Sequence, residues 1–309
     1  MKQRIALGLD LGGTQIKAAV VREDGQVIHQ AQSETPASRG VDAVAERIGA
    51  LGRDALKRFP EIGGCGLGAP GLVDLNRCMV RTAPNFPTWR NVPLAELISQ
   101  RFGRFVILEN DVNCFGLAEQ RWGAGRGIKH LLALAVGTGI GGAIILDGRL
   151  YRGSSGAAAE LGHISVDLWG PRCGCGNLGC AERYLGEQWF TQAAQVELDD
   201  EAISSPAEVS RRAEKGDPLA LNFLEGRGEI MGVLCTNLIH AFDPEAIIIG
   251  GGIAQAGESF FRGVRKSVQE RAYTILAQKV KIIPAQLGTI AGALGAAALA
   301  LENGRRTNP

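Results

Sequence analysis

Short apolar runs alternate with glycine-containing turns at the start of the chain, a pattern typical of antiparallel strands. We predict strands in RIALGLDLG (4–12), TQIKAAVV (14–21) and VIHQAQ (27–32), with a glycine turn after the first and an Asp-Gly turn before the third. Residues 42–59 change to helical spacing, with apolar side chains returning on one face. We then predict strand, helix, strand and helix in 65–71, 94–103, 105–110 and 112–123.

The segment HLLALAVGTGIGGAIILDGRL (130–150) repeats the layout of strand, glycine turn, strand, Asp-Gly turn and strand. We predict that helices and strands follow it near 184–196, 206–215, 217–240, 246–252, 258–273, 280–285 and 289–302. This duplication predicts an α/β protein of two facing domains, each a mixed sheet with a three-stranded antiparallel meander and flanking helices. We place their boundary in the glycine-rich RWGAGRGIK (121–129), which gives domains of residues 1–121 and 122–309. Whether the last helix packs back on the first domain stays open.

The overall composition argues against several classes of protein. The 33 Lys and Arg balance 32 Asp and Glu, so no field of one sign indicates a nucleic-acid or membrane partner. The N-terminal residues lack a signal peptide's apolar run, and no stretch reaches the roughly 20 apolar residues of a membrane span. We therefore expect a cytoplasmic protein. Seven cysteines, an odd number, argue against a disulfide framework, and four of them are expected to be core or near-core residues: Cys65, Cys78, Cys114 and Cys235.

Glycines also stand between strands, where bare backbone amides could hold phosphate oxygens. In GLDLGGTQIK, Gly12 and Gly13 form such a turn and Thr14 adds a hydroxyl. Asp10 could hold Mg²⁺ through water, and Lys17 could face either phosphates or solvent. We include Lys17 among the candidate nucleotide-binding residues. The alternative is a hairpin turn that merely requires glycine.

Two later glycine runs extend this pattern. VGTGIGG (136–142) has the spacing of a dinucleotide-binding fingerprint, but a strand rather than a helix is predicted after it, so the Rossmann interpretation fails. Two glycine–threonine hairpins at related positions, the second with Thr138 and Gly139, instead predict nucleotide phosphates held between two domains. The run IIIGGG ends in Gly251 and Gly252 and suits close approach by a nucleoside.

Asn110 and Asp111 stand between a predicted strand and a predicted helix. An aspartate at this place is usually an N-cap. The functional alternative is a general base that accepts the proton of a substrate hydroxyl during phosphoryl transfer. Because α/β sheets bind ligands beyond the carboxyl ends of their strands, the position favours Asp111 as that base.

The segment ELGHISVDLWGPRCGCGNLGCAER (160–183) collects cysteines and a histidine among glycines. Cys173, Cys175, Cys180 and His163 are a ligand set suited to a tetrahedral zinc ion. An iron–sulfur cluster usually requires four cysteines, and the redox spacing C-x-x-C is absent here. The remaining alternative is a loop with reduced thiols. Since four protein ligands leave no open position, we expect the metal to be structural.

Together these motifs resemble the ROK family (repressors, open reading frames and sugar kinases) of the actin-like and hexokinase-like ATPase superfamily. In order, they are DLGGTQIK, GLGAPGLVD, APNFPTW, ENDVNCFGLAEQRWGAGRG, VGTGIGGAIILDGRLYRGSSGAAAELGH, CGCGNLGCAE, IIIGGG and GTIAGALGAA. The resemblance covers nearly the whole chain. It implies two actin-like (ribonuclease H-like) domains and an enzyme that phosphorylates the 6-hydroxyl of a hexose, with ATP, Mg²⁺ and a structural Zn²⁺.

The resemblance also implies a role for each candidate residue. Asp111 would be the catalytic base, with Asp10 near Mg²⁺. The phosphates of ATP would contact Gly12, Gly13, Thr14, Thr138 and Gly139, and its adenosine would lie near Gly251 and Gly252. The sugar would contact Gly71, Asn85, Asn110, Asp111, Glu160, His163 and Glu182. Zinc would be bound within the loop 163–182 by His163, Cys173, Cys175 and Cys180.

Within the family, the short segment ISVDLWGPR favours glucose, because some N-acetylglucosamine kinases have a long insertion there. N-acetylmannosamine, N-acetylglucosamine, fructose and allose are the alternative substrates. One departure is the alanine before Glu160 in AAAELGH, where glucokinase-like members commonly have glycine.

Many family members are instead sugar-sensing repressors with an N-terminal winged-helix domain. Here the first predicted strand begins at Arg4 and the charges balance, so we expect no DNA-binding domain. The two-domain layout predicts a hinge near 121–129 with closure on substrate. We further expect a homodimer.

Overall fold

A computed structural model describes residues 3–76 and 78–303, and it contains two five-stranded sheets with the same strand arrangement. The contacts of the chain divide into two units. Unit 1 holds the described residues of Met1–Arg126, Leu150–Ala158 and Thr289–Pro309, and unit 2 holds Gly127–Arg149 and Ala159–Gly288. The extreme ends of the two predicted domains, residues 1–2 and 304–309, lie outside the described residues.

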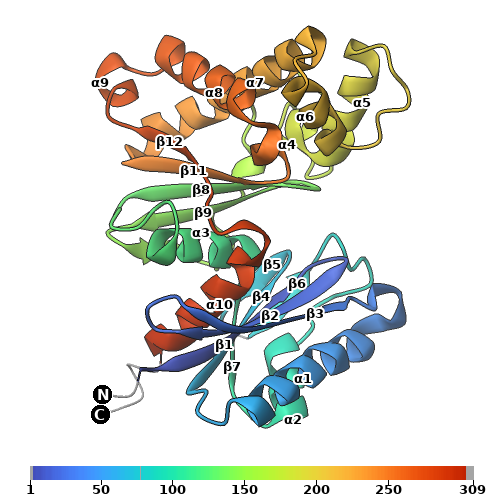
Figure 1. Cartoon of the computed structure of the whole chain (residues 1–309), viewed down its shortest axis with the longest axis vertical. Coiled ribbons are helices and arrows are strands. Elements are labelled where there is room, and N and C mark those ends of the chain that lie inside the picture. The colour runs from blue at the N-terminus through green and yellow to red at the C-terminus, as the bar shows by residue number, and fades with distance from the viewer. Residues whose placement is uncertain (1–2, 77, 304–309) are drawn as a thin grey trace. The chain divides into compact units, whose positions relative to one another are not determined.

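The sheet of unit 1 has the order β3-β2-β1-β4-β7 (Figure 1). Its strands are β1 (Ile5–Leu11), β2 (Gln15–Arg22), β3 (Val27–Glu34), β4 (Gly64–Ala69) and β7 (Val106–Asn110). The first three form the predicted antiparallel meander, and β4 and β7 continue from β1 in parallel. A separate antiparallel hairpin, which the sequence pattern did not indicate, consists of β5 (Leu72–Asp74) and β6 (Met79–Thr82).

Helices cover both faces of this sheet, because alternate residues of β1 point in opposite directions. They are α1 (Gly40–Arg58), α2 (Leu94–Phe102), α3 (Asp111–Trp122) and α10 (Ala291–Asn303). Leu7 and Leu9 belong to the apolar core that contains the buried faces of α1 and α2. Gly8 faces the other way, and a Cβ there would lie 1.8 Å from the carbonyl oxygen of Ala293. The C-terminal helix α10 (red in Figure 1) therefore packs backbone-to-backbone on β1.

The sheet of unit 2 has the corresponding order β10-β9-β8-β11-β12. Its strands are β8 (Leu131–Val136), β9 (Ile140–Leu146), β10 (Arg149–Leu150), β11 (Ala246–Gly251) and β12 (Lys281–Pro284). Strand β8 is antiparallel to β9 and parallel to β11, as β1 is to β2 and β4. The duplicated layout predicted from the glycine turns is therefore present, and the mixed α/β fold class is confirmed.

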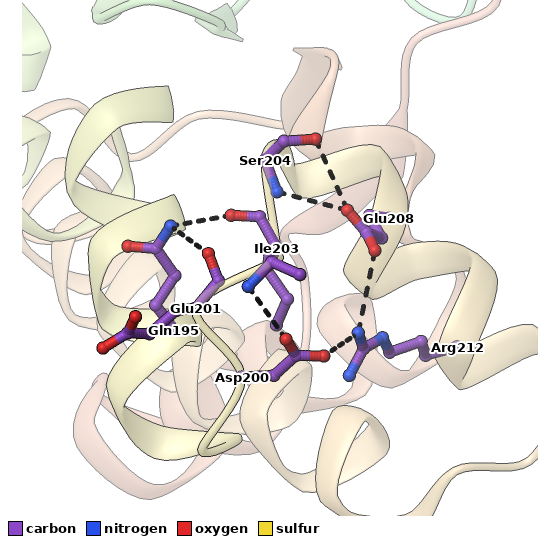
Figure 2. Close-up of polar contacts among 8 residues, drawn as sticks. Gln195, Asp200, Glu201, Ile203, Ser204, Glu208 and Arg212 are labelled. Carbon is purple, nitrogen blue, oxygen red and sulfur yellow. Dashed lines mark hydrogen bonds and ion pairs between the residues drawn. The ribbon is translucent and has the colours of Figure 1, made fainter.

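The helices of unit 2 are α4 (Glu182–Leu185), α5 (Glu187–Glu197), α6 (Pro206–Glu214), α7 (Pro218–Phe242), α8 (Glu258–Arg271) and α9 (Thr274–Ala277). The single helix predicted near 184–196 is divided in two, because Gly186 adopts an extended backbone between α4 and α5. Polar contacts organise the connection from α5 to α6, where Asp200 pairs with Arg212 and Glu208 accepts from Ser204 (Figure 2). Among the described helices, none is both long and apolar enough to cross a membrane.

Candidate active site

The turn from Gly12 to Thr14 joins β1 to β2, and Thr35 fixes its shape. The Thr35 hydroxyl donates to the carbonyl oxygen of Gly12 and its backbone N–H donates to that of Thr14, each at 2.8 Å. The side-chain amide of Asn85 lies against Gly13, where a Cβ would be 2.9 Å from Nδ2. The structure thus brings a predicted phosphate turn and a predicted sugar-binding residue together. It adds Thr35, which no motif singled out.

Asp10 lies at the end of β1 against the first turn of α10. A Cβ on Gly292 would be 2.6 Å from the carboxyl carbon of Asp10, so only glycine allows this approach. Lys17, the register partner of Asp10 on β2, donates from Nζ to the carbonyl oxygen of Thr289 at 2.7 Å. Burial, reinforced by the charge of Asp111, raises the pKa of Asp10 to about 7, and the Lys17 ammonium opposes this shift. A divalent cation beside Asp10 would favour its ionised form.

Asn110, rather than Asp111, is the N-cap of α3. Its Oδ1 accepts from the backbone N–H groups of Val112 and Asn113 at 2.9 and 3.0 Å, and its Nδ2 donates to the carbonyl oxygen of Gly71 at 3.2 Å. Asp111 is the first residue of the helix, where the helix dipole favours a carboxylate. The capping role considered for Asp111 is therefore filled by its neighbour.

The second predicted phosphate turn joins β8 to β9 in unit 2, and the start of α5 holds it in place. The backbone N–H of Glu187 donates to the carbonyl oxygen of Gly137 at 2.9 Å, and Gly137 N–H donates to that of Gly139 at the same distance. Gly251 lies beside this turn because it pairs with Val136 in the parallel register of β11 and β8. A Cβ on Gly251, at φ 89°, would be 2.1 Å from the Val136 carbonyl oxygen. Two of the predicted nucleotide-binding turns therefore meet at one edge of this sheet.

Glu182 and Glu160 lie close to His163. Glu182 Oε1 is 3.9 Å from His163 Nδ1, and Glu182 Oε2 accepts from the backbone N–H of Ile140 at 2.9 Å. Partial burial and the charge of Glu182 raise the pKa of Glu160, while His163 opposes the shift. The backbone of Ala159, immediately before Glu160, is left-handed with φ 74°. The alanine noted in the sequence thus occupies a conformation that glycine adopts without strain.

The ligand atoms of His163, Cys173, Cys175 and Cys180 all lie within 4.8 Å of one another. Cys173 Sγ is 3.6 Å from His163 Nδ1, and Cys175 Sγ is 3.7 Å from Cys180 Sγ. A tetrahedral zinc ion with Zn–S bonds of about 2.3 Å and a Zn–N bond of about 2.0 Å would separate its ligands by about 3.5–3.8 Å. The donor set and these two distances therefore fit a structural zinc ion.

Two of the three thiols in this cluster have shifted pKa values. Burial and the neighbouring thiols raise the pKa of Cys180 to about 12, whereas a hydrogen bond from the Asn177 backbone N–H lowers the pKa of Cys175. A divalent ion at the centre of the cluster would ionise all three, since it binds thiolates.

The described residues thus form two sets, each within one unit. In unit 1 the structure groups the sequence-predicted residues Asp10, Gly12, Gly13, Thr14, Lys17, Gly71, Asn85, Asn110 and Asp111. In unit 2 it groups Thr138, Gly139, Glu160, His163, Cys173, Cys175, Cys180, Glu182, Gly251 and Gly252. Sequence reasoning missed Thr35, Glu109 and Arg152, because each acts through a contact distant in sequence.

The chain is similar to known proteins over nearly its whole length. Residues 6–303 match the ROK family. The chain is 36% identical to a glucokinase of Thermotoga maritima, over 96% of this chain and 97% of that protein. A ROK family glucokinase from Streptomyces griseus, solved with glucose and AMPPNP, has 34% identity and a TM-score of 0.85, over 96% of this chain and 99% of that one. A xylose repressor of Bacillus spizizenii is 30% identical over 98% of this chain and 78% of its own length.

Proposed function

Because the chain belongs to the ROK family, we propose that it is an ATP-dependent glucokinase that phosphorylates the 6-hydroxyl of glucose. The observation that carries this proposal is the S. griseus glucokinase, which was solved with glucose and AMPPNP and matches this chain over nearly its whole length. AMPPNP is an analogue of ATP, so that structure pairs a hexose with a nucleoside triphosphate. The proposal is further supported by the gathering of the predicted site residues into two local sets, one in each unit.

In the proposed reaction, Asp111 accepts the proton of the 6-hydroxyl as its oxygen attacks the γ-phosphorus of ATP. The bond from the γ-phosphorus to the bridging oxygen breaks, and ADP leaves. The position of Asp111 at the carboxyl end of β7 and the start of α3 supports this role. Asn110 is held by Gly71 and by α3, so the residue beside the base is fixed before substrate arrives.

The two glycine turns supply the amides for phosphate binding. Gly12, Gly13, Thr14 and Lys17 act from unit 1, and Thr138 and Gly139 act from unit 2, with Gly251 and Gly252 near the adenosine. Such fixed donors stabilise charge that develops during phosphoryl transfer. Asp10 would hold Mg²⁺, which when bound neutralises phosphate charge.

Recognition of the sugar is assigned to carboxylates, amides and an imidazole, because hexose hydroxyls both donate and accept hydrogen bonds. We assign Gly71, Asn85, Asn110, Glu160, His163 and Glu182 to this task. His163 Nδ1 faces Cys173, which leaves Nε2 for a hydroxyl. Cys173, Cys175 and Cys180, with His163, would hold a zinc ion that stiffens the loop carrying Glu160 and Glu182.

The deciding experiment is a rate screen with ATP over glucose, fructose, allose, N-acetylglucosamine and N-acetylmannosamine. Glucose should give the highest kcat/KM, and a glucose-6-phosphate dehydrogenase coupling step should detect its product. A higher kcat/KM for an N-acylhexosamine would overturn glucose as the substrate while keeping the kinase. No turnover of any sugar, together with specific DNA binding in a gel shift, would favour a regulator such as the xylose repressors.

A cytoplasmic homodimer is part of the same proposal. The free cysteines of the chain are consistent with a reducing compartment. Size-exclusion chromatography with light scattering measures the oligomeric state, and a monomeric mass at micromolar concentration would contradict the dimer.

A further inference from the structure

Glu109 is a buried carboxylate immediately before Asn110 and Asp111, with its side chain only 2% exposed. Its Oε2 accepts from Arg152 Nε at 2.6 Å. Its Oε1 accepts from the backbone N–H of Asn110 at 3.0 Å and from Asn113 Nδ2 at 2.9 Å. Both oxygens are therefore engaged, and two of the three donors belong to the segment that carries the proposed base.

These contacts determine how the chain passes from β7 into α3. Glu109 holds the backbone N–H of Asn110, and Asn110 in turn caps α3 and bonds Gly71. Asn113, one turn into the helix, is tied to the same carboxylate. Asp111 lies between these fixed points, and its Oδ1 accepts from the backbone N–H of Val112 at 2.9 Å. The position of the Asp111 backbone therefore depends on Glu109.

Arg152 reaches Glu109 from the segment Leu150–Ala158, which belongs to unit 1 although the residues before and after it belong to unit 2. The segment closes on itself, because Ala158 N–H donates to the carbonyl oxygen of Arg152 at 3.2 Å. It is also seated at Gly156, where φ is 87° and a Cβ would be 3.1 Å from the Val73 carbonyl oxygen. The ion pair with Arg152 thus connects the strand that carries the proposed base to the segment that leads into Glu160.

We propose that Glu109 and Arg152 form a positioning pair that orients Asp111 for proton transfer. The inference rests on the proposed function. A buried carboxylate that loses its cationic partner keeps the cost of desolvation, so it must shift or take up a proton. Either change disturbs the Asn110 N–H and moves the base, and a displacement of about 1 Å at a reacting group can lower a rate about 100-fold. Neither Glu109 nor Arg152 would contact the substrates.

The test compares Arg152→Met, Arg152→Lys, Glu109→Gln and the double variant Glu109→Gln/Arg152→Met with the wild-type kinase. Arg152→Met should lower kcat by about 30- to 100-fold and leave the KM values for ATP and sugar within about twofold. Arg152→Lys should recover part of the rate because it restores a cation. The double variant should be no slower than the slower single variant, since the two residues act as one unit.

Arg4→Met is the matched control. Arg4 pairs with Glu23 in unit 1 beside the start of β1, the end remote from Asp10, and its side chain is 37% exposed against 36% for Arg152. It should change the melting temperature but not kcat. Because Arg152 is partly exposed, its variants should fold even if Glu109→Gln does not, and the test can then be made with them alone.

The positioning role is supported if the wild-type protein turns over and the Arg152 variants lose kcat without a change in KM. If the wild-type protein turns over and Arg152→Met keeps a normal kcat, or loses no more kcat than Arg4→Met, the positioning role is overturned. The proposed function then still stands. A rise in the KM for sugar at unchanged kcat also overturns it, because that result would make Arg152 a binding residue.

Discussion

Glu182 accepts a hydrogen bond from the backbone N–H of Ile140, with 2.9 Å between the two atoms. Ile140 directly follows the proposed phosphate turn, and Glu182 begins α4 just beyond Cys180, the last cysteine of the candidate metal site. One carboxylate therefore ties the end of the cysteine loop to the turn that is proposed to bind ATP.

Gly139→Ala should weaken ATP binding. A Cβ at this position would lie 2.3 Å from Glu182 Oε2, so the carboxylate must rotate away and release Ile140. A hydrogen bond to a charged group contributes about 1.5–3 kcal/mol, so the KM for ATP should rise about 10-fold or more. Steady-state rates at varied ATP measure this effect. The control is Gly137→Ala in the same turn, where a Cβ meets open space; equal effects of the two changes would contradict the role of Glu182.

Asp111→Asn should abolish most turnover and leave binding intact. The amide keeps the size of the side chain but cannot take the proton of the sugar hydroxyl, and a general base contributes about 10²- to 10⁴-fold to the rate. Initial-rate assays measure kcat, and calorimetric titration measures the dissociation constant for glucose, so the effects on turnover and on binding are separated. Asp54→Asn, on the exposed face of α1, should behave as wild type. A near-normal kcat in Asp111→Asn would remove it as the base.

The cysteine cluster should contain about one zinc ion per chain, because one imidazole and three thiols gather with their ligand atoms within 4.8 Å of one another. Metal analysis of protein purified without chelator tests this directly, and iron or no metal would contradict it. Removal of the ion should lower the melting temperature and raise the KM for sugar, since the loop carries Glu160 and Glu182. Cys175→Ser should reproduce both effects. Cys78→Ser, at a half-buried cysteine outside the cluster, should reproduce neither.

The sequence predicted the elements whose signals are local. Apolar alternation around the Asp-Gly turns identified both meanders, and glycine at 103 marked the end of α2. One alternative from sequence made Asp111 the N-cap of α3, whereas the cap is Asn110. The two could not be told apart because asparagine and aspartate are equally good caps. The division of the helix near 184–196 was missed, since a lone glycine does not always end a helix.

Contacts between distant segments could not be predicted. Nothing in the pattern of 150–158 indicates that Arg152 reaches Glu109, forty-three residues earlier. The proposed zinc ligands were found from sequence because three of them lie within eight residues and share one chemistry. An ion pair between a partly exposed arginine and a buried glutamate has no such signature, since each partner alone resembles a surface charge in the sequence.

Ala159→Gly should stabilise the protein. Alanine at φ 74° is strained by contact between its Cβ and the backbone, at a cost of roughly 1–2 kcal/mol that glycine avoids. Glycine also adds about 0.5–1 kcal/mol of freedom to the unfolded chain, so we expect a net gain of about 0.5–1 kcal/mol in the free energy of unfolding, measured with urea. Ala158→Gly is the control, and there glycine should destabilise by about 0.5–1 kcal/mol because it adds freedom to the unfolded chain. A loss of stability in Ala159→Gly would refute the strain.

Asp200 should stabilise unit 2 only while it is ionised. The hydrogen bond from Arg212 (Figure 2) and that from the Ala202 backbone N–H lower the pKa of Asp200 below its ordinary value of 3.8. A lowered folded-state pKa means that the unfolded chain binds the proton more readily, so the contribution is present above about pH 4 and is lost as pH falls through the lowered pKa.

Asp200→Asn should therefore reduce the melting temperature at pH 7, and its difference in melting temperature from wild type should shrink below pH 4. Asp199→Asn is the control, because asparagine also accepts its left-handed backbone at φ 49°. If the melting temperatures of Asp200→Asn and wild type differ by the same amount from pH 7 to pH 3, the Asp200 charge does not organise the α5–α6 connection.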